Sequence, residues 1–383
     1  MRASGRSHNP HPSSNGGHGM RRSAETTTTY ANAARPTVAR TAGLCAVAFL
    51  AAFAAPAAHA KATPVKPNPA RVAMPEAVPK PHPVQSRSAP LAQAKTALLP
   101  FQTAPFPYRG EVPGTGHPFL DVVNEEGRRG HTTPYGRLYW EDETYADDRV
   151  LLHIPKGFDI RRPSVIVVFF HGHGATLERD VLRRQRVADQ ISRSGANAVL
   201  IAPQFAVDAA DSSAGRFWEP GAFGRFMGEA TQALTKLHGD RRSAVSFASA
   251  PVVFVAYSGG YLAAATCATK GGLKKRLRGV VLLDALYGEL GKFTSWIEND
   301  RSAFFVSAYL GSTRDKNVEL ATILASKDIA YETELDRPLN QGDVTFLSGL
   351  SGGEDVSHRS FVTRAWVDNP IEDLLRRLPG YRR

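Results

Sequence analysis

The chain contains at residues 252–261 the run Val252-Val253-Phe254-Val255-Ala256-Tyr257-Ser258-Gly259-Gly260-Tyr261. Its β-branched and aromatic residues are typical of a buried strand, and they stop at Ser258. Two glycines and an alanine-rich segment follow, which is the pattern of a sharp turn into a helix. Such a strand–turn–helix unit holds a serine at a strained backbone angle with its hydroxyl exposed. We therefore predict that Ser258 is a nucleophile, with Ala256 in the place where the usual G-x-S-x-G motif has glycine.

A second stretch, Gly349-Leu350-Ser351-Gly352-Gly353, matches G-x-S-x-G literally. It follows a strand-like run at residues 344–347, but the residues after it, Glu354-Asp355-Val356, have no helical pattern. A motif counts only in the structural setting that its chemistry needs. The sequence therefore predicts that Ser351 lies in a glycine-rich loop and is not the nucleophile.

The first 107 residues do not have the pattern of a folded domain. Residues 41–58 are uncharged and alanine-rich, follow Arg35 and Arg40, and end near Ala58-His59-Ala60. This order of basic, apolar and small residues predicts a secretory signal peptide over residues 1–60, cleaved after Ala60; the alternative is an uncleaved membrane anchor. Residues 61–107 are rich in proline and predict a disordered linker. The protein is therefore expected to be exported, either to the periplasm or outside the cell.

Charge and cysteine content limit the class of partner. The 383-residue chain has a formal net charge of +11, and residues 1–60 hold six arginines and one glutamate, so the mature chain keeps +6. The surplus is spread out, and no zinc spacing or RNA-binding motif is present, so we expect no nucleic-acid partner. A mildly basic exported protein can favour the anionic cell envelope. Cys267 is the one cysteine left after cleavage, so no internal disulfide is possible, and we expect it to be inert packing.

From residue 108 onward, apolar runs alternate with helical spacing. Continuous apolar runs such as residues 164–170 and 198–202 are typical of strands buried on both faces of a parallel sheet. The pattern predicts an α/β fold with a doubly wound, mostly parallel sheet in one domain, residues 108–383. Further strands are expected at 138–140 and 149–154 (as two antiparallel strands), 252–257, 280–283, 304–310, 329–335 and 344–347, and helices at 177–194, 221–237, 293–298, 317–326 and 371–378.

A glycine-containing loop, His171-Gly172-His173-Gly174, directly follows the predicted strand at 164–170. Glycines at such a place let backbone N–H groups turn inward, where they can hold a developing negative charge. We predict an oxyanion hole formed by the N–H of His173 or Gly172 together with that of Gly259.

This combination of His171-Gly172 after a strand, an elbow at Ser258 and a late histidine resembles the α/β-hydrolase superfamily over about residues 130–383. The resemblance implies serine chemistry and the chain order serine, acid, histidine. His358 is the only histidine C-terminal to the elbow, so it is the predicted base.

Two aspartates compete for the role of the acid. Asp284 ends the strand at 280–283, where a carboxylate would be held rigidly, whereas Asp315 lies five residues beyond the next strand. The superfamily most often uses the second position, but Asp315 adjoins Arg314 and Lys316 and could simply begin a helix. We favour Asp284 and keep Asp315 as the alternative.

The sequence defines the residues of the substrate pocket less clearly than those of the elbow. Residues 205–225, which include Phe217-Trp218, connect a strand to a helix and could form a small aromatic flap, although Phe217 and Trp218 could equally be core anchors. Trp218, Tyr257 and Tyr287 are the predicted substrate-binding residues. Only about twenty residues separate the strands at 280–283 and 304–310, so no large lid domain is expected there. His171 and His173 form one close pair without a third ligand, so we expect no metal site and no cofactor.

These features favour an exported serine hydrolase that cleaves an ester of a small-molecule or polymeric acyl substrate, like a carboxylesterase. Two alternatives stay open. The protein could be an amidase or peptidase that acts on cell-wall peptides, or a catalytically inactive hydrolase fold that serves as a binding protein.

Overall fold

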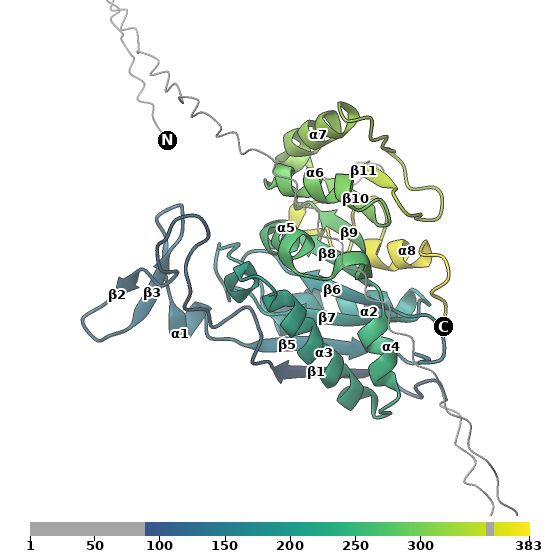
Figure 1. Ribbon diagram of the computed structural model, residues 1–383, viewed down its shortest axis with the longest axis horizontal. Coiled ribbons are helices and arrows are strands. Elements are labelled where there is room, and N and C mark those ends of the chain that lie inside the picture. The colour runs from purple at the N-terminus through teal and green to yellow at the C-terminus, as the bar shows by residue number, and fades with distance from the viewer. Residues whose placement is uncertain (1–88, 350–355) are drawn as a thin grey trace, which may run out of the picture. The chain divides into compact units, whose positions relative to one another are not determined.

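The largest element of the structure is a sheet of eight strands (Figure 1). The computed structural model describes residues 89–349 and 356–383. The strands of this sheet are β1 (Lys95–Pro100), β5 (Arg149–Ile154), β6 (Val165–Phe170), β7 (Ala198–Pro203), β8 (Val252–Tyr257), β9 (Leu277–Leu283), β10 (Phe304–Tyr309) and β11 (Val344–Ser348). In space they follow the order β1-β5-β7-β6-β8-β9-β10-β11.

Within this sheet the strands from β7 to β11 pair in parallel, whereas β5 is antiparallel to both of its neighbours, β1 and β7. The predicted mostly parallel sheet is therefore confirmed. Between β9 and β10 the chain adds only the helix α6 (Leu290–Asn299), so no large lid is inserted there.

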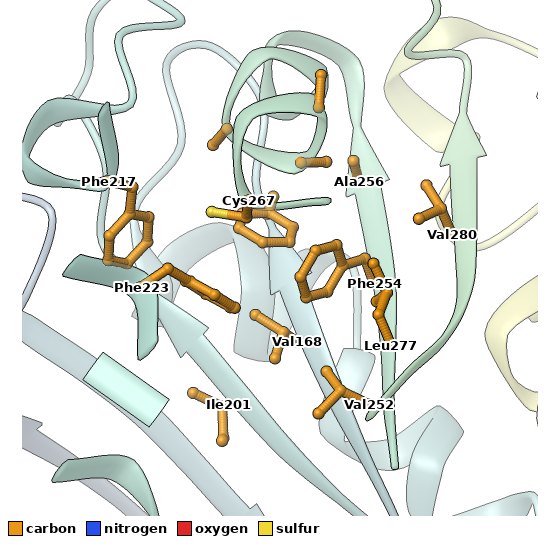
Figure 2. Packing of buried hydrophobic residues seen from close by; sticks show 14 of the residues in the cluster. Val168, Ile201, Phe217, Phe223, Val252, Phe254, Ala256, Cys267, Leu277 and Val280 are labelled. Carbon is orange, nitrogen blue, oxygen red and sulfur yellow. The ribbon is translucent and has the colours of Figure 1, made fainter. Parts of the chain in front are cut away.

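Helices cover both faces of the sheet, and the strand sequences explain why. Successive side chains of a strand point to opposite faces, so a strand buried on both sides must be apolar throughout. In β8, Val252, Phe254 and Ala256 pack in one buried layer, while Val253 and Val255 pack in the other. Figure 2 shows part of the first layer, where Phe254 of β8, Val168 of β6 and Phe223 of α3 gather below Cys267.

The first layer is covered by α3 (Ala222–His238), α4 (Ser243–Ser249), α5 (Tyr261–Lys270), α6 and α7 (Gly311–Ala325). The second is covered by the π-helix η1 (Leu177–Arg184) and by α2 (Val187–Arg193) and α8 (Pro370–Arg376). Cys267 of α5 is buried, and burial raises the pKa of its thiol, as suits inert packing. In the described part of the chain, no helix combines the length and apolarity needed to cross a bilayer. Short 3₁₀ turns complete the described elements: η2 (Gly215–Trp218), η3 (Ser258–Gly260), η4 (Lys274–Arg276) and η5 (His358–Ser360).

A second, three-stranded antiparallel sheet precedes β5 in the chain. It consists of β2 (Val122–Val123), β3 (Arg129–Thr132) and β4 (Leu138–Trp140), followed by the one-turn helix α1 (Glu141–Thr144). The sequence predicted residues 138–140 and 149–154 as two antiparallel strands. Both are strands, but they belong to different sheets: β4 pairs with β3, and β5 pairs with β1 and β7.

The prediction of a linker over residues 61–107 is wrong for its last part. β1 pairs along its whole length with β5, and Phe101 and Phe106 are buried in the first core layer. Burying a phenylalanine stabilises the fold by about 1.5–3 kcal/mol, which outweighs the low apolar content of the surrounding sequence. The folded domain therefore begins before residue 108. The predicted signal peptide and linker residues 61–88 lie outside the described residues, as does Ser351.

Two further elements differ from the sequence pattern. Residues 329–335 form only an isolated bridge, between Glu332 and Thr345, in place of an edge strand. The predicted helix at 177–194 is broken in two, because Arg186 adopts a left-handed backbone angle between η1 and α2. This break orients η1 independently, so that Arg184 reaches the segment after β11.

Candidate active site

Ser258 lies where β8 turns into α5, at the carboxyl edge of the parallel strands. Its φ angle is +53°, a left-handed conformation that a non-glycine residue adopts only when its surroundings impose it. The turn is crowded: a Cβ added to Gly172 would lie 2.6 Å from the Ser258 Cβ, and one added to Gly260 would overlap the backbone oxygen of Phe170. Glycine is therefore required after the serine, at Gly260, and in the facing loop, at Gly172.

The structure brings Ser258, His358 and Asp284 together in one hydrogen-bonded line. The Nε2 of His358 lies 2.9 Å from the Oγ of Ser258, and its Nδ1 lies 2.5 Å from the Oδ2 of Asp284. A carboxylate can only accept, so Nδ1 carries a proton, and Nε2 of the neutral ring is left to accept the proton of the serine hydroxyl. These three side chains come from the ends of β8 and β9 and from η5.

Asp284 is fully buried, and its surroundings favour the charged form. Burial by itself disfavours the carboxylate, but hydrogen bonds from His358, from the Thr313 hydroxyl and from the Leu310 N–H outweigh it and hold the pKa of Asp284 below its ordinary value. Asp315, the alternative acid, is exposed on the first turns of α7 and contacts neither His358 nor Ser258.

The predicted oxyanion loop lies directly against the elbow. The N–H of Gly174 donates to the Ala209 carbonyl, but no acceptor engages the N–H of His173 or of Gly259 among the described residues. The His173 ring packs against Gly259, and its Nε2 lies 2.7 Å from the Ser212 hydroxyl. Two unpaired backbone donors thus lie beside Ser258, which is the arrangement that an oxyanion requires.

His171 holds this loop in place. The Phe205 N–H donates to its Nε2 at 2.8 Å, so the proton sits on Nδ1, which lies 2.9 Å from the Gly172 carbonyl oxygen. Burial lowers the pKa of His171 to about 4, so the ring is neutral at physiological pH. A neutral ring with one donor and one acceptor fits these two partners and fixes the backbone at Gly172.

Tyr257 holds His358 as well as lining the cleft. Its hydroxyl donates to the His358 carbonyl at 2.9 Å, and the two rings stack with centroids 5.1 Å apart. From the π-helix, Arg184 donates to the Arg359 carbonyl at 2.8 Å while its Nε pairs with Asp180. The turn that carries His358 is thus fastened from two sides. The predicted role of Tyr257 in substrate binding has no direct contact to support it, whereas its hydrogen bond and ring stacking do position His358.

A cleft of about 1600 Å³ opens at Ser258. Trp218 and Tyr287, both predicted to bind substrate, line it. Trp218 also packs edge-on against Tyr108 and Phe119, so it is partly a core anchor, and Phe217 is wholly buried. Within the described ranges, no group of three or more metal-ligating side chains comes together.

Sequence reasoning missed several residues that shape the site. Thr313 lies in the Gly311–Asp315 segment, in which the sequence analysis considered only Asp315. The Thr313 hydroxyl donates to Asp284. The outer cleft wall comes from the three-stranded sheet, which contributes Thr132 and Tyr135. The spacing Pro134-Tyr135-Gly136 is a turn signal that could have located this wall, but nothing local ties it to Ser258.

Comparison with known proteins finds no matching family model and no matching curated protein. Among solved structures, the chain is similar to a feruloyl esterase module from Clostridium thermocellum complexed with sinapinate (13% identity, TM-score 0.40, covering 71% of this chain and 94% of that one). It is also similar to an S-formylglutathione hydrolase from Agrobacterium tumefaciens (11% identity, TM-score 0.37, covering 68% of this chain and 99% of that one). A third similar structure is a ferulic acid esterase (12% identity, TM-score 0.38, covering 75% of this chain and 99% of that one).

The assignment of the fold depends on the chain's own features. These are the eight-stranded, mostly parallel sheet, the strained serine between β8 and α5, and the order Ser258, Asp284, His358 along the chain. The fold is that of the α/β-hydrolases.

Proposed function

We propose that this protein is a serine hydrolase that cleaves carboxylic esters through an acyl-enzyme on Ser258. The observation that carries the proposal is the unbroken hydrogen-bonded line from the Ser258 Oγ through the His358 ring to the buried carboxylate of Asp284. A binding protein that had lost catalysis would have no need to keep this line, nor the strained φ angle of +53° at the serine.

In the first half of the reaction, His358 Nε2 takes the proton of the Ser258 hydroxyl as Oγ attacks the ester carbonyl carbon. The carbonyl oxygen becomes negatively charged and accepts hydrogen bonds from the N–H groups of Gly259 and His173. Asp284 stabilises the imidazolium that forms and keeps the ring in its orientation. The tetrahedral species then collapses, His358 protonates the departing alcohol oxygen, and the acyl group stays on Ser258.

In the second half, water enters and gives a proton to His358 while its oxygen attacks the acyl carbon. Collapse of this second tetrahedral species breaks the bond to Ser258 Oγ, which regains its proton from His358, and the carboxylic acid leaves. An alcohol departs more readily than an amine, so esters are the substrates that this apparatus cleaves with the least further assistance.

The test of this function is active-site labelling. A fluorophosphonate probe is expected to label the protein and to fail on Ser258→Ala, while Ser351→Ala, the literal G-x-S-x-G serine, keeps full labelling. Turnover of p-nitrophenyl acetate should follow the same pattern, and p-nitroacetanilide, the matching amide, separates an esterase from an amidase. A folded wild-type protein that takes no label would overturn the mechanism in favour of a binding protein.

We also propose that the protein is exported, on the strength of the apolar, alanine-rich segment 41–58 and the Ala58-His59-Ala60 site. N-terminal sequencing of protein recovered outside the cytoplasm should begin at Lys61. Protein found only in the cytoplasm with an intact N-terminus would contradict export.

A further inference from the structure

A tight turn at residues 133–136 presents one tyrosine at the mouth of the cleft. The Gly136 N–H donates to the Thr133 carbonyl at 2.8 Å, and the Thr133 N–H donates to the Arg137 carbonyl at 2.8 Å. Pro134 limits the backbone on one side of the turn, and Gly136 takes a φ of +77°, in the left-handed range, on the other. Tyr135, between them, lines the cleft and is 92% exposed.

The three-stranded sheet that carries this turn is fastened to the rest of the domain. The Tyr139 hydroxyl accepts a hydrogen bond from the Ala210 N–H at 3.0 Å, and the Tyr145 hydroxyl, after α1, donates to Asp211 at 3.0 Å. The ring of His131, in β3, stacks on that of Phe119 with centroids 4.1 Å apart. These bonds hold the outer wall of the cleft in place, so Tyr135 is presented from a fixed support.

Two further tyrosines lie in the same cleft near Ser258. Tyr261 begins α5, directly after the elbow, and its ring centroid is 6.0 Å from that of Tyr287. Tyr287 is 38% exposed and meets the His358 ring edge-on at 6.4 Å. Burial is the main cause that raises the pKa of Tyr261. The neighbouring Glu289 and Tyr135 raise it further. We call Tyr135, Tyr261 and Tyr287 the tyrosine rim.

Exposed aromatic rings on fixed supports are efficient contacts for a planar ligand. Tyrosine has few side-chain torsions to order, so binding costs it little entropy. A ring offered to such residues gains from offset or edge-on packing beyond simple burial. An aliphatic chain gains burial alone.

We propose that the tyrosine rim binds an aromatic ring of the substrate, so that the preferred esters carry an aromatic group on the acyl or the alcohol side. This inference rests on the proposed ester hydrolysis at Ser258, and it names the substrate class of that site. The same ring chemistry can come from either side of the ester bond, and the substrates below distinguish the two sources.

The test compares methyl cinnamate, with an aromatic acyl group, phenyl acetate, with an aromatic alcohol, and methyl butyrate, with neither. Tyr135→Ala is expected to lower the ratio of kcat/KM for the aromatic ester to that for methyl butyrate about five-fold, on the order of one aromatic contact. The ester whose ratio falls identifies the side that binds. Tyr135→Phe keeps the ring and should keep the ratio.

Val123→Ala is the matched control, because Val123 is an exposed apolar residue of the same small sheet that does not line the cleft. Equal losses on all three esters in Tyr135→Ala, or no change in either ratio, would overturn the proposal. Calorimetric binding of methyl cinnamate to Ser258→Ala separates the two hypotheses. If Tyr135→Ala weakens this binding but the wild type turns over none of the esters, the tyrosine rim is supported and ester hydrolysis is contradicted. If the wild type turns over the esters but Tyr135→Ala leaves the kcat/KM ratios unaltered, hydrolysis is supported and the rim is contradicted.

Discussion

The Nδ1 of His358 lies 2.5 Å from the Oδ2 of Asp284, although 74 residues separate them in the chain. The other oxygen of Asp284 accepts hydrogen bonds from the Leu310 N–H and the Thr313 hydroxyl, both at the start of α7. The carboxylate of Asp284 is therefore held by the start of α7 on one oxygen and contacts the histidine with the other. This arrangement makes the orientation of His358 depend on a segment that has no hydrogen bond to Ser258.

Replacing Asp284 by asparagine tests its place in the line. The amide cannot stabilise the imidazolium and favours the wrong tautomer of His358, so kcat should fall by roughly 10³–10⁴-fold. Steady-state kinetics with p-nitrophenyl acetate measure the effect. Asp315→Asn is the control, since Asp315 is exposed on α7, and it should keep activity within about two-fold. The opposite result in the two variants would assign the acid to Asp315.

Thr313→Val tests the support behind the carboxylate. In the folded protein the pKa of Asp284 lies below its ordinary value. The charged carboxylate therefore contributes its full stabilisation at a pH above that ordinary value, and this contribution is lost as the pH falls through the folded-state pKa. Without the Thr313 hydroxyl the pKa is depressed less, and the midpoint of acid unfolding, followed by circular dichroism, should move to higher pH. Thr322→Val, at an exposed site on α7, should leave the midpoint in place. An unchanged midpoint in Thr313→Val would show that the hydroxyl does not stabilise the charge.

Tyr257→Phe tests the fastening of His358. The substitution keeps the ring that stacks on the imidazole and removes only the hydroxyl that donates to the His358 carbonyl. One hydrogen bond is worth about 1 kcal/mol, so we expect kcat to fall by about five-fold. The matched variant Tyr287→Phe loses a hydroxyl without a bond to His358 and should change kcat less. Equal effects in both variants would argue that Tyr257 acts through substrate contact alone.

The sequence carried enough information for the elbow because its signal is local. The strand, Ser258 and the two glycines are contiguous, and a Cβ added to Gly259 or Gly260 would overlap neighbouring atoms. His358 could be predicted only by elimination, as the last histidine of the chain. The choice between Asp284 and Asp315 depends on where Thr313 and Leu310 converge, which is set by tertiary packing. No local pattern holds that information.

The outer elements were missed for a different reason. β1 reads Lys95-Thr96-Ala97-Leu98-Leu99-Pro100 directly after a proline-rich stretch, and as an edge strand it is only partly buried. It therefore lacks the continuous apolar run by which the central strands were predicted. The wall at Tyr135 is likewise part of a small, half-exposed sheet whose contacts with the cleft join segments far apart in the sequence.

The pairing of β1 with β5 and the burial of Phe101 and Phe106 predict how far the chain can be shortened from its N-terminal side without unfolding the domain. A chain that begins at Ala89 retains β1, Phe101 and Phe106, whereas one that begins at residue 108 loses them all. Removing two buried phenylalanines typically costs about 3–5 kcal/mol each, and the loss of β1 also leaves one edge of β5 unpaired. Because native domains are stable by only about 5–15 kcal/mol, the shorter chain should be largely unfolded, and the longer one should melt cooperatively. Differential scanning calorimetry of the two chains decides the matter: equal melting temperatures would mean that residues 89–107 are a linker after all.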